Sequence, residues 1–277
     1  MPATPHGTRV ELLGSPLDVV DMDEAVARCE RAIAAGEYLQ HMSVNAAKLV
    51  AMRSDRELRE AVNSCELVTA DGQSVVWAAR LFGIRLPERV AGIDLMQRML
   101  GAANERGYRV YFLGAKQEVL EKAIGRLRER YPELVVAGSQ HGYFGDEEID
   151  AVAEAIRESK PDVLFVAMSS PRKEHFLGRL GPSLGAAFAM GVGGSVDVIA
   201  GVTKRAPVVL QRAGLEWAYR MAQEPRRLAK RYLPTNASFV GMVLRERFTR
   251  RSSAPGGVAA AAPADAAART EPADQRD

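Results

Sequence analysis

The chain has 277 residues, of which 47% are hydrophobic and 26% are charged, a composition typical of one large or two small globular domains. Two cysteines exclude a disulfide scaffold, and the absence of 18 consecutive uncharged apolar residues excludes an obvious membrane-spanning helix. The net charge is only +2, yet residues 202–251 hold 12 Lys and Arg against 3 Asp and Glu. We therefore expect an anionic partner for this segment.

Short apolar runs alternate with segments of helical spacing along most of the chain. The expected strands are residues 38–45, 66–72, 108–115, 134–140, 161–170 and 186–197, the last running into a glycine-rich turn. The expected helices are residues 46–63, with a break near Ser54 and Asp55, then 95–107, 116–131, 146–160 and 171–180. This alternation predicts an α/β fold with a Rossmann-like, mostly parallel sheet and helices on both faces.

The composition divides the chain into four parts. We expect a flexible leader at residues 1–8, an α/β catalytic core at 9–204 and a basic helical appendage at 205–251. Residues 252–277 hold 10 Ala together with Pro, Gly and Asp. They have too little apolar surface to offset the entropy of ordering, so a disordered tail is expected.

Ligands of open α/β sheets bind beyond the carboxyl ends of the strands. Polar, charged or glycine residues lie at or just after the ends of the expected apolar strands: Ser43, Asn45, Asp71, Gly114, Lys116, Ser169, Ser170, Lys173, Gly191, Gly193, Gly194 and Asp197. This gathering predicts a ligand site at one edge of the sheet without identifying the ligand.

Two of these residues have a structural alternative. Asp71 at a strand end can act as a general base, or it can cap the helix that begins within QSVVWAARLF, and its position does not decide between them. Asn45 can hold a sugar hydroxyl, but its position before Ala46 favours a helix cap.

The remaining motifs give little support for other chemistry. The stretch GVGGSVD (191–197) allows close approach of a phosphate or a base, or is simply a tight turn, and it lacks the dinucleotide spacing. Asp21 and Asp23 have the DxD form of metal-dependent sugar transferases, but they precede a clear helix, which favours capping. The four histidines form no metal-binding pair, so we expect no metal and no cofactor.

Eight segments together resemble the WecG/TagA/CpsF family of bacterial glycosyltransferases. The resemblance runs from about residue 10 to residue 235, with the segments in order and at compatible spacing. They are SVNAAK, LVTADGQSVV, LPERVAGIDL, VYFLGAKQEV, YPELVVAGSQHGYF, PDVLFVAMSSPRKE, GVGGSVDVIAGVTKRAP and GLEWAYRMAQEPRRLAKRY.

The resemblance implies an inverting, metal-independent enzyme of cell-surface polysaccharide synthesis. Such an enzyme moves a sugar, typically N-acetylmannosamine, from a UDP-sugar donor to a polyprenyl-diphosphate-linked sugar acceptor. It would be cytoplasmic and peripheral on the inner face of the cell membrane, with the basic appendage on the anionic membrane surface. We expect no nucleic-acid partner, and a homo-oligomer remains open.

The resemblance also implies roles for individual residues. Asp71 matches the proposed general base, while Ser43 and Asn45 match a T-x-N motif in which Ser43 replaces Thr. The other implied substrate contacts are Arg89 and Gly92 of the R-V-x-G motif, Gly191, Gly193, Gly194 and Asp197 of the uridine-binding turn, and the appendage arginines Arg220, Arg227 and Arg231 near the diphosphate.

One position departs from the family pattern. Lys173 stands where the family usually carries Gln, near the donor sugar, so the donor need not be N-acetylmannosamine. Lys173 can instead pair with Glu174 or point to solvent. The alternative function, a non-catalytic membrane- or nucleotide-binding module on a Rossmann-like core, would leave Asp71 without a purpose.

Overall fold

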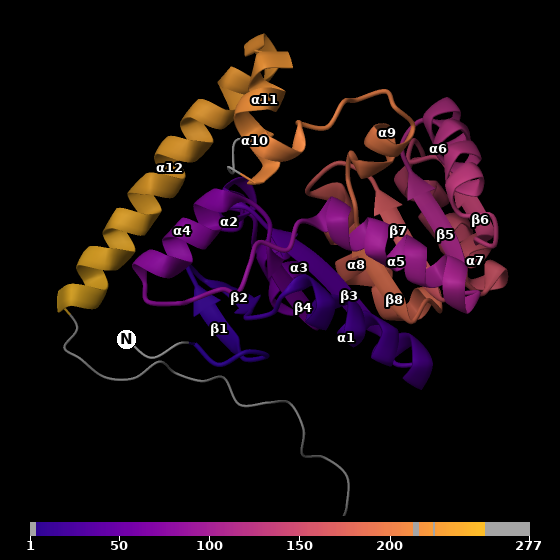
Figure 1. Ribbon diagram of the computed structural model, residues 1–277, viewed down its shortest axis with the longest axis horizontal. Helices are drawn as coiled ribbons and strands as arrows, with labels where there is room; N and C mark the ends of the chain where they lie inside the picture. The colour runs from indigo at the N-terminus through magenta and orange to yellow at the C-terminus, as the bar shows by residue number, and fades with distance from the viewer. Residues whose placement is uncertain (1–3, 213–215, 224, 253–277) are drawn as a thin grey trace, which may run out of the picture.

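The computed structural model describes residues 4–212, 216–223 and 225–252. Its centre is a six-stranded parallel sheet in the order β4-β3-β8-β7-β5-β6 (Figure 1). The strands are β3 (Leu39–Val44), β4 (Leu67–Ala70), β5 (Arg109–Gly114), β6 (Val135–Gln140), β7 (Val163–Ala167) and β8 (Phe188–Gly191). Each lies within a segment where a strand was expected, so the predicted parallel sheet is confirmed.

Helices cover both faces of this sheet. The first face packs against α1 (Met22–Ala35), α5 (Gly92–Arg106), α6 (Gln117–Arg130) and α9 (Ser195–Ile199). The second packs against α2 (Ala46–Ala51), α3 (Arg56–Asn63), α7 (Ile149–Ser159) and α8 (Arg172–Leu180). The expected break in the 46–63 helix is present, because Asp55 caps α3 by accepting from Leu58 N at 2.9 Å.

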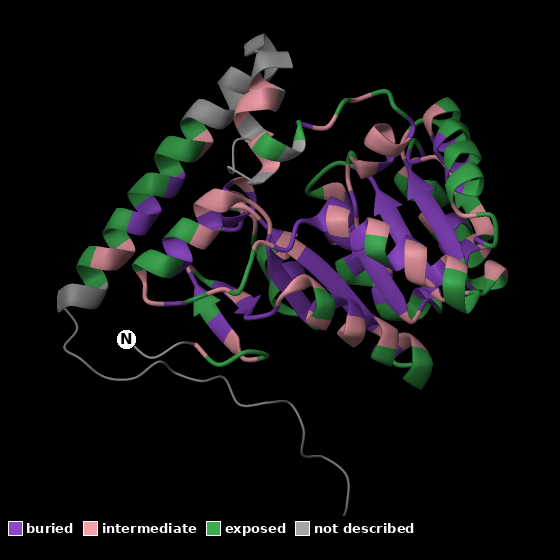
Figure 2. Ribbon diagram, viewed as in Figure 1, coloured by how far each residue is buried: buried purple, intermediate pink, exposed green. Residues whose placement is uncertain are grey.

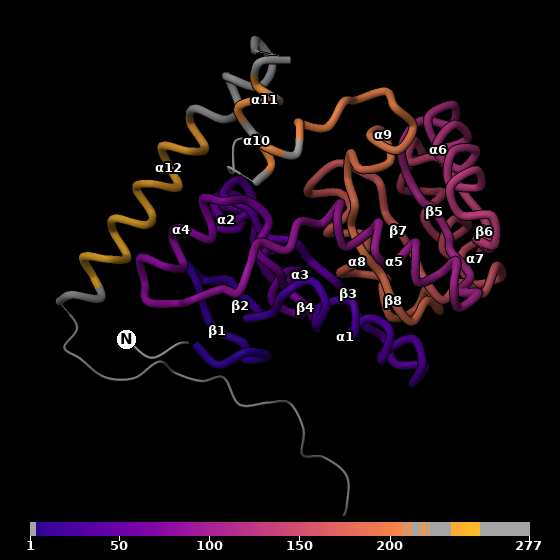
Figure 3. The backbone as a smooth tube through the Cα atoms, viewed as in Figure 1, coloured from indigo at the N-terminus to yellow at the C-terminus, as the bar shows by residue number. Residues whose placement is uncertain are grey.

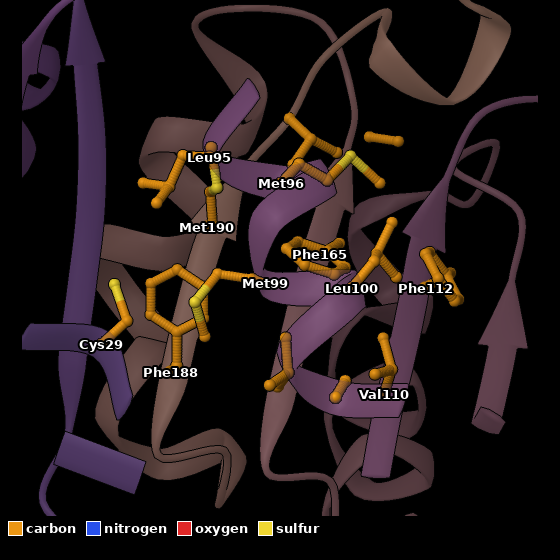
Figure 4. Packing of buried hydrophobic residues seen from close by; sticks show 14 of the residues in the cluster. Cys29, Leu95, Met96, Met99, Leu100, Val110, Phe112, Phe165, Phe188 and Met190 are labelled. Carbon is orange, nitrogen blue, oxygen red and sulfur yellow. The ribbon is translucent and has the colours of Figure 1, made fainter. Parts of the chain in front are cut away.

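Apart from the edge strand β6, whose residues are exposed or half-buried, the strands are mostly buried on both sides, which explains why they read as nearly continuous apolar runs (Figure 2). On the first face, Met96, Met99 and Leu100 of α5 lie over the aromatic rings of the middle strands (Figure 4). Phe165 forms ring contacts with Phe112 at 5.8 Å and with Phe188 at 6.4 Å between centroids. This packing holds β5, β7 and β8 together as a rigid platform.

A short antiparallel hairpin precedes the sheet and was not expected from the sequence. It consists of β1 (Arg9–Leu12) and β2 (Ser15–Asp18), joined by a two-residue turn with positive φ at Leu13 and Gly14. Leu at the first turn position gives none of the Asn-Gly or Asp-Gly signal that marks such turns. The buried Asp18 carboxylate ties the hairpin to the sheet by accepting from Val68 N at 2.7 Å.

Three helices follow the core: α10 (Val208–Arg212), α11 (Glu216–Gln223) and α12 (Pro225–Ser252). Figure 3 traces the connection after α9 that leads from the sheet to α10 and α11. The second half of α12 packs beside α2, with Phe239, Met242 and Val243 buried in the second-face core. The division of the chain at residue 205 stays a prediction, and residues 253–277 of the expected tail lie outside the described residues.

Two further observations concern the ends of the described chain. Gly7, in the expected leader, donates its N–H to Val19 O at 2.8 Å, while residues 1–3 lie outside the described residues. Within the part of the chain that the structure describes, no helix is long and apolar enough to cross a membrane.

The close approach of β5 and β7 generates a prediction at Gly114. A Cβ at this position would lie 2.4 Å from the carbonyl carbon of Ala167, and the φ of Gly114 is +125°. We expect Gly114→Ala to lower the free energy of unfolding by about 2 kcal/mol or more, measured by urea denaturation. Gly125→Ala is the control, because nothing lies within 4 Å of a Cβ in this exposed position on α6. It should raise stability by about 0.5–1 kcal/mol, and similar losses in both variants would contradict the explanation.

Candidate functional site

The connections of the sheet diverge where β3 lies beside β8. From β3 the chain passes through α2 and α3 to β4, at the edge of the sheet. From β8 it passes to α9, which packs against α6 over the other half of the sheet. Ligands of open α/β sheets bind at such a reversal, outside the carboxyl ends of the strands. The ends of β4, β3 and β8 therefore form the candidate site, which we call the rim.

Sequence-predicted residues from three segments meet at the rim. Asp71 donates its N–H to Val44 O at 2.8 Å, which extends the pairing of β3 and β4 to the residue after β4. A Cβ placed on Gly92 would lie 3.3 Å from Ser43 Oγ, so the first turn of α5 closes on the end of β3. Ser43 and Asp71, which were expected at one edge of the sheet, are thus brought together there with Gly92 of the R-V-x-G motif.

The structure decides the capping alternative for Asn45 but not for Asp71. Asn45 caps α2 by accepting from Lys48 N at 3.0 Å, as its position favoured. The helix after Asp71 is α4 (Gln73–Leu81), and the residue at its N-cap position is Gly72, so Asp71 lies one residue before that position. Asn45 therefore has a structural role whatever else it does, and the role of Asp71 stays a prediction.

The glycine-rich turn follows β8 at the same edge. Gly193 has a φ of +50° and donates its N–H to Val166 O at 3.4 Å, which ties the turn to β7. A Cβ on Gly194 would lie 3.7 Å from Asp197 Oδ2, so these residues are close together. Burial raises the pKa of Asp197. The backbone of this turn therefore lies close to the acidic side chain of Asp197 at the rim.

Lys173 lies beneath this turn. A Cβ on Gly191 would lie 3.0 Å from Lys173 Cδ, so Gly191 leaves room for the lysine stem. The Lys173 ammonium lies 2.6 Å from Glu174 Oε1, and both side chains are buried. The alternative that Lys173 pairs with Glu174 is therefore confirmed. Contact of Lys173 with a donor sugar stays a prediction.

The same carboxylate oxygen binds a second lysine. Lys48 Nζ lies 2.9 Å from Glu174 Oε1 and donates to Met42 Sδ at 2.9 Å. Burial disfavours the charged form of Glu174, but Lys48 and Lys173 outweigh that effect and lower its pKa to about 2. We call Lys48, Glu174 and Lys173 the buried triad. It joins the first turns of α2 and α8 just below the rim.

A second group of charges lies above the rim. Arg205 binds Asp94 through two hydrogen bonds, of 2.6 and 2.8 Å, and lies 3.7 Å from Glu216. Burial disfavours the charged guanidinium, yet Asp94 above all, with Glu216 and Asp71, raises the pKa of Arg205. Arg89 is another of the predicted site residues. Its guanidinium lies 3.6 Å from the carboxylate of Glu216 on α11, the same carboxylate that lies beside Arg205.

Some predicted residues are not brought to the rim. Gly114 ends β5, which is separated from β8 by β7. The backbone of Ala167 leaves no room for a side chain at this position, which explains the glycine there. The backbones of Arg220, Arg227 and Arg231 belong to α11 and α12, but their side chains lie outside the described residues.

The sequence analysis named Glu174 only as a possible partner of Lys173, and it did not single out Lys48, Asp94 or Arg205. All four residues lie within the segments that carry the family resemblance, but nothing in a sequence distinguishes a buried charge from a solvated one.

The other acidic and histidine candidates have structural partners. Asp21 caps α1 by accepting from Glu24 N at 2.8 Å, which confirms capping. His41 Nε2 lies 2.8 Å from Thr69 Oγ1, and burial, assisted by Lys48, lowers the His41 pKa to about 3. Over residues 4–212, 216–223 and 225–252, no group of three or more His, Cys, Asp or Glu residues could hold a metal ion.

The comparison with protein families agrees with these features. The model of the glycosyl transferase WecG/TagA/CpsF family matches residues 10–253, which include the whole sheet, the rim and helices α1 to α12.

The buried triad generates a prediction about stability. Glu174→Gln leaves two buried ammonium groups without their carboxylate, so we expect the free energy of unfolding to fall by about 3–5 kcal/mol at pH 7. The control is Glu60→Gln, which makes the same change on the exposed face of α3 where Glu60 pairs with Arg56. It should cost less than about 0.5 kcal/mol.

The pH dependence of this loss is a further check on the same variant. Because its folded pKa is depressed from 4.5 to about 2, Glu174 stabilises the protein above pH 4.5, and this stabilisation disappears as the pH falls toward 2. The difference between wild type and Glu174→Gln should therefore shrink by roughly 3 kcal/mol over that range. A difference that stays constant with pH would show that Glu174 is not a charged partner of the lysines.

Proposed function

This chain belongs to the WecG/TagA/CpsF family of glycosyltransferases, and from that premise we propose that it transfers a sugar from a UDP-sugar to a polyprenyl-diphosphate-linked sugar. The family supports a glycosyltransferase of cell-surface polysaccharide synthesis, and so favours an enzyme over a non-catalytic binding module. The identity of the donor, the identity of the acceptor and the inversion at the anomeric carbon are parts of this proposal.

The observation that carries the proposal is the position of Asp71. Asp71 follows β4 at the rim, one residue before the N-cap position of α4, and lies close enough to Arg205 to affect the pKa of that guanidinium. A carboxylate at such an edge can accept the proton of an acceptor hydroxyl as that oxygen attacks the anomeric carbon. We assign Asp71 as the general base on this ground and on the family motif.

Ser43 and Asn45 are proposed to orient a sugar hydroxyl. Ser43 Oγ lies at the end of β3, against the first turn of α5. The side-chain oxygen of Asn45 accepts the hydrogen bond that caps α2, so its amide nitrogen is the atom proposed to donate to the substrate. Both residues are fixed by backbone elements, which keeps a bound hydroxyl at a defined distance from Asp71.

The other end of the donor requires positive charge and backbone donors. As UDP leaves, negative charge develops on its diphosphate, and arginine side chains and backbone N–H groups can stabilise it in place of a metal. We propose the turn containing Gly191, Gly193, Gly194 and Asp197 for the uridine end. Arg89, Arg220, Arg227 and Arg231 are proposed for the diphosphate, and the activity is proposed to need no metal.

The acceptor lipid places the reaction beside a membrane, and α12 offers a surface that fits this. Val240, Leu244 and Phe248 are exposed at four-residue spacing, with the exposed Arg245 beside them. An apolar stripe next to basic side chains favours the surface of an anionic membrane. We propose peripheral binding to the cytoplasmic face through this part of the chain.

A donor screen tests the function directly. Purified protein is mixed with each of a panel of UDP-sugars and a short-chain prenyl-diphosphate-sugar acceptor, and the products are read by mass spectrometry. We expect one donor to add a single sugar to the acceptor with release of UDP, and we expect the transfer to persist in EDTA. Transfer from no UDP-sugar would overturn the proposed function, and restoration of an EDTA-inactivated enzyme by Mg²⁺ would overturn the metal-independent reaction.

Asp71→Asn tests the general base. It should lower turnover by roughly 10²–10⁴-fold at saturating acceptor, because the amide cannot take the proton, while UDP binding by calorimetry stays within about twofold. The matched control is Asp23→Asn, in the DxD-like pair, where Asp23 is exposed and pairs with Arg98. Its turnover should stay within about twofold of wild type, since an exposed pair of this kind contributes little. Near-normal turnover of Asp71→Asn would remove Asp71 from the reaction.

A further inference from the structure

Glu216 lies between two arginines that come from distant parts of the chain. Its Oε2 is 3.6 Å from Arg89 Nη1, in the loop before α5, and its Oε1 is 3.7 Å from Arg205 Nε, in the connection after α9. The three side chains are only 14–18% exposed. Two guanidinium groups thus converge on one anionic group in a mostly dry environment above the rim.

The carboxylate of Glu216 does not satisfy all the hydrogen-bond donors of the two arginines. Both contacts are longer than the 2.7–2.9 Å of a charge-assisted hydrogen bond. Asp94 accepts from Nη1 and Nη2 of Arg205, which holds the guanidinium plane in place. The remaining nitrogen, Nε, is buried and has no hydrogen-bond partner among the described residues. A buried donor of this kind is costly unless a ligand satisfies it.

A phosphate group fits this arrangement better than the carboxylate does. It has more charge and more acceptor oxygens, arranged tetrahedrally, so one group can accept from Arg205 Nε and from Arg89 together. The position also suits the proposed reaction, because Arg205 lies near Asp71 while its orientation is fixed by Asp94.

We propose that Arg89 and Arg205 form a phosphate-binding pair for the diphosphate of the donor, and that Glu216 occupies this pair in the free protein and competes with the ligand. The assignment of the ligand rests on the proposed function. The new elements are Arg205 as a binding residue and Glu216 as the internal competitor, two roles that the sequence did not suggest.

Removal of the competing charge is the most direct test. Inorganic pyrophosphate and UDP are titrated separately into the full chain and into Glu216→Gln by calorimetry at low salt. If Glu216 competes, the variant binds both ligands roughly 2- to 10-fold more tightly, the range expected when an ion pair of modest strength no longer blocks the site. Glu60→Gln, with the same charge change on exposed α3, should bind pyrophosphate as the wild type does.

The geometry of Arg205 supplies the second variant. Arg205→Lys keeps the positive charge but loses the planar guanidinium and its Nε donor, so pyrophosphate binding should weaken by roughly 10-fold. Circular dichroism and a thermal melt establish that the variant is folded, because Arg205 also binds Asp94. If it does not fold, the Glu216→Gln titration decides the proposal alone.

One result of the pyrophosphate titration would contradict the proposal. Pyrophosphate binding that is unchanged or weaker in Glu216→Gln means that Glu216 only fastens α11 to the core, and it overturns the competition. The proposed function fails separately, through the donor screen, because pyrophosphate binding is measured without any sugar transfer. Tighter pyrophosphate binding without sugar transfer would leave the phosphate-binding pair in place and remove the reaction.

Discussion

Two lysine ammonium groups share one buried carboxylate oxygen immediately below the carboxyl edge of the sheet, and the geometry of the rim depends on this contact. Glu174 on α8 binds Lys48 on α2 at 2.9 Å and its neighbour Lys173 at 2.6 Å. Taking three charges out of water is expensive, and only close pairing offsets the cost. The contact therefore admits little variation in how α2 and α8 approach each other. Both lysines also touch the rim residues, because Lys48 N donates to Asn45, which caps α2, and the Lys173 stem lies against Gly191.

The charges above the rim have a different character from those below it. The buried triad makes short contacts of 2.6 and 2.9 Å, whereas Glu216 meets its two arginines at 3.6 and 3.7 Å. The proposed metal-independent reaction relies on cations that are fixed in direction. Asp94 fixes the direction of Arg205 through two hydrogen bonds, and in our proposal the diphosphate replaces Glu216 at its long contacts. A rigid lower layer and a replaceable upper layer fit the proposed release of UDP.

The sequence predicted the sheet and its helices, and it pointed to the edge at which the candidate residues gather, because apolar periodicity and strand-end polarity are local properties. It missed the β1–β2 hairpin, whose turn uses Leu13 and Gly14 without the usual signal. It also did not single out Lys48 and Arg205, although both lie within the segments that carry the family resemblance. Their importance comes from partners far away in the chain, Glu174 for Lys48 and Asp94 for Arg205. Pairing of this kind depends on the tertiary structure, so composition and spacing could not reveal it.

The substitution at Lys173 takes a different meaning once its partner is known. In the family pattern this position is a neutral Gln near the donor sugar, which suggests direct contact between Lys173 and the sugar. In the structure, the Lys173 ammonium lies against Glu174 and its stem lies under Gly191, on the side of the sheet covered by α8. The extra charge therefore acts first on the buried triad. Lys173 also has an indirect route to the proposed donor, because its stem lies against Gly191 at the start of the turn proposed to bind uridine. In our proposal, donor selection therefore depends on how that turn is supported as well as on the residues that touch the sugar.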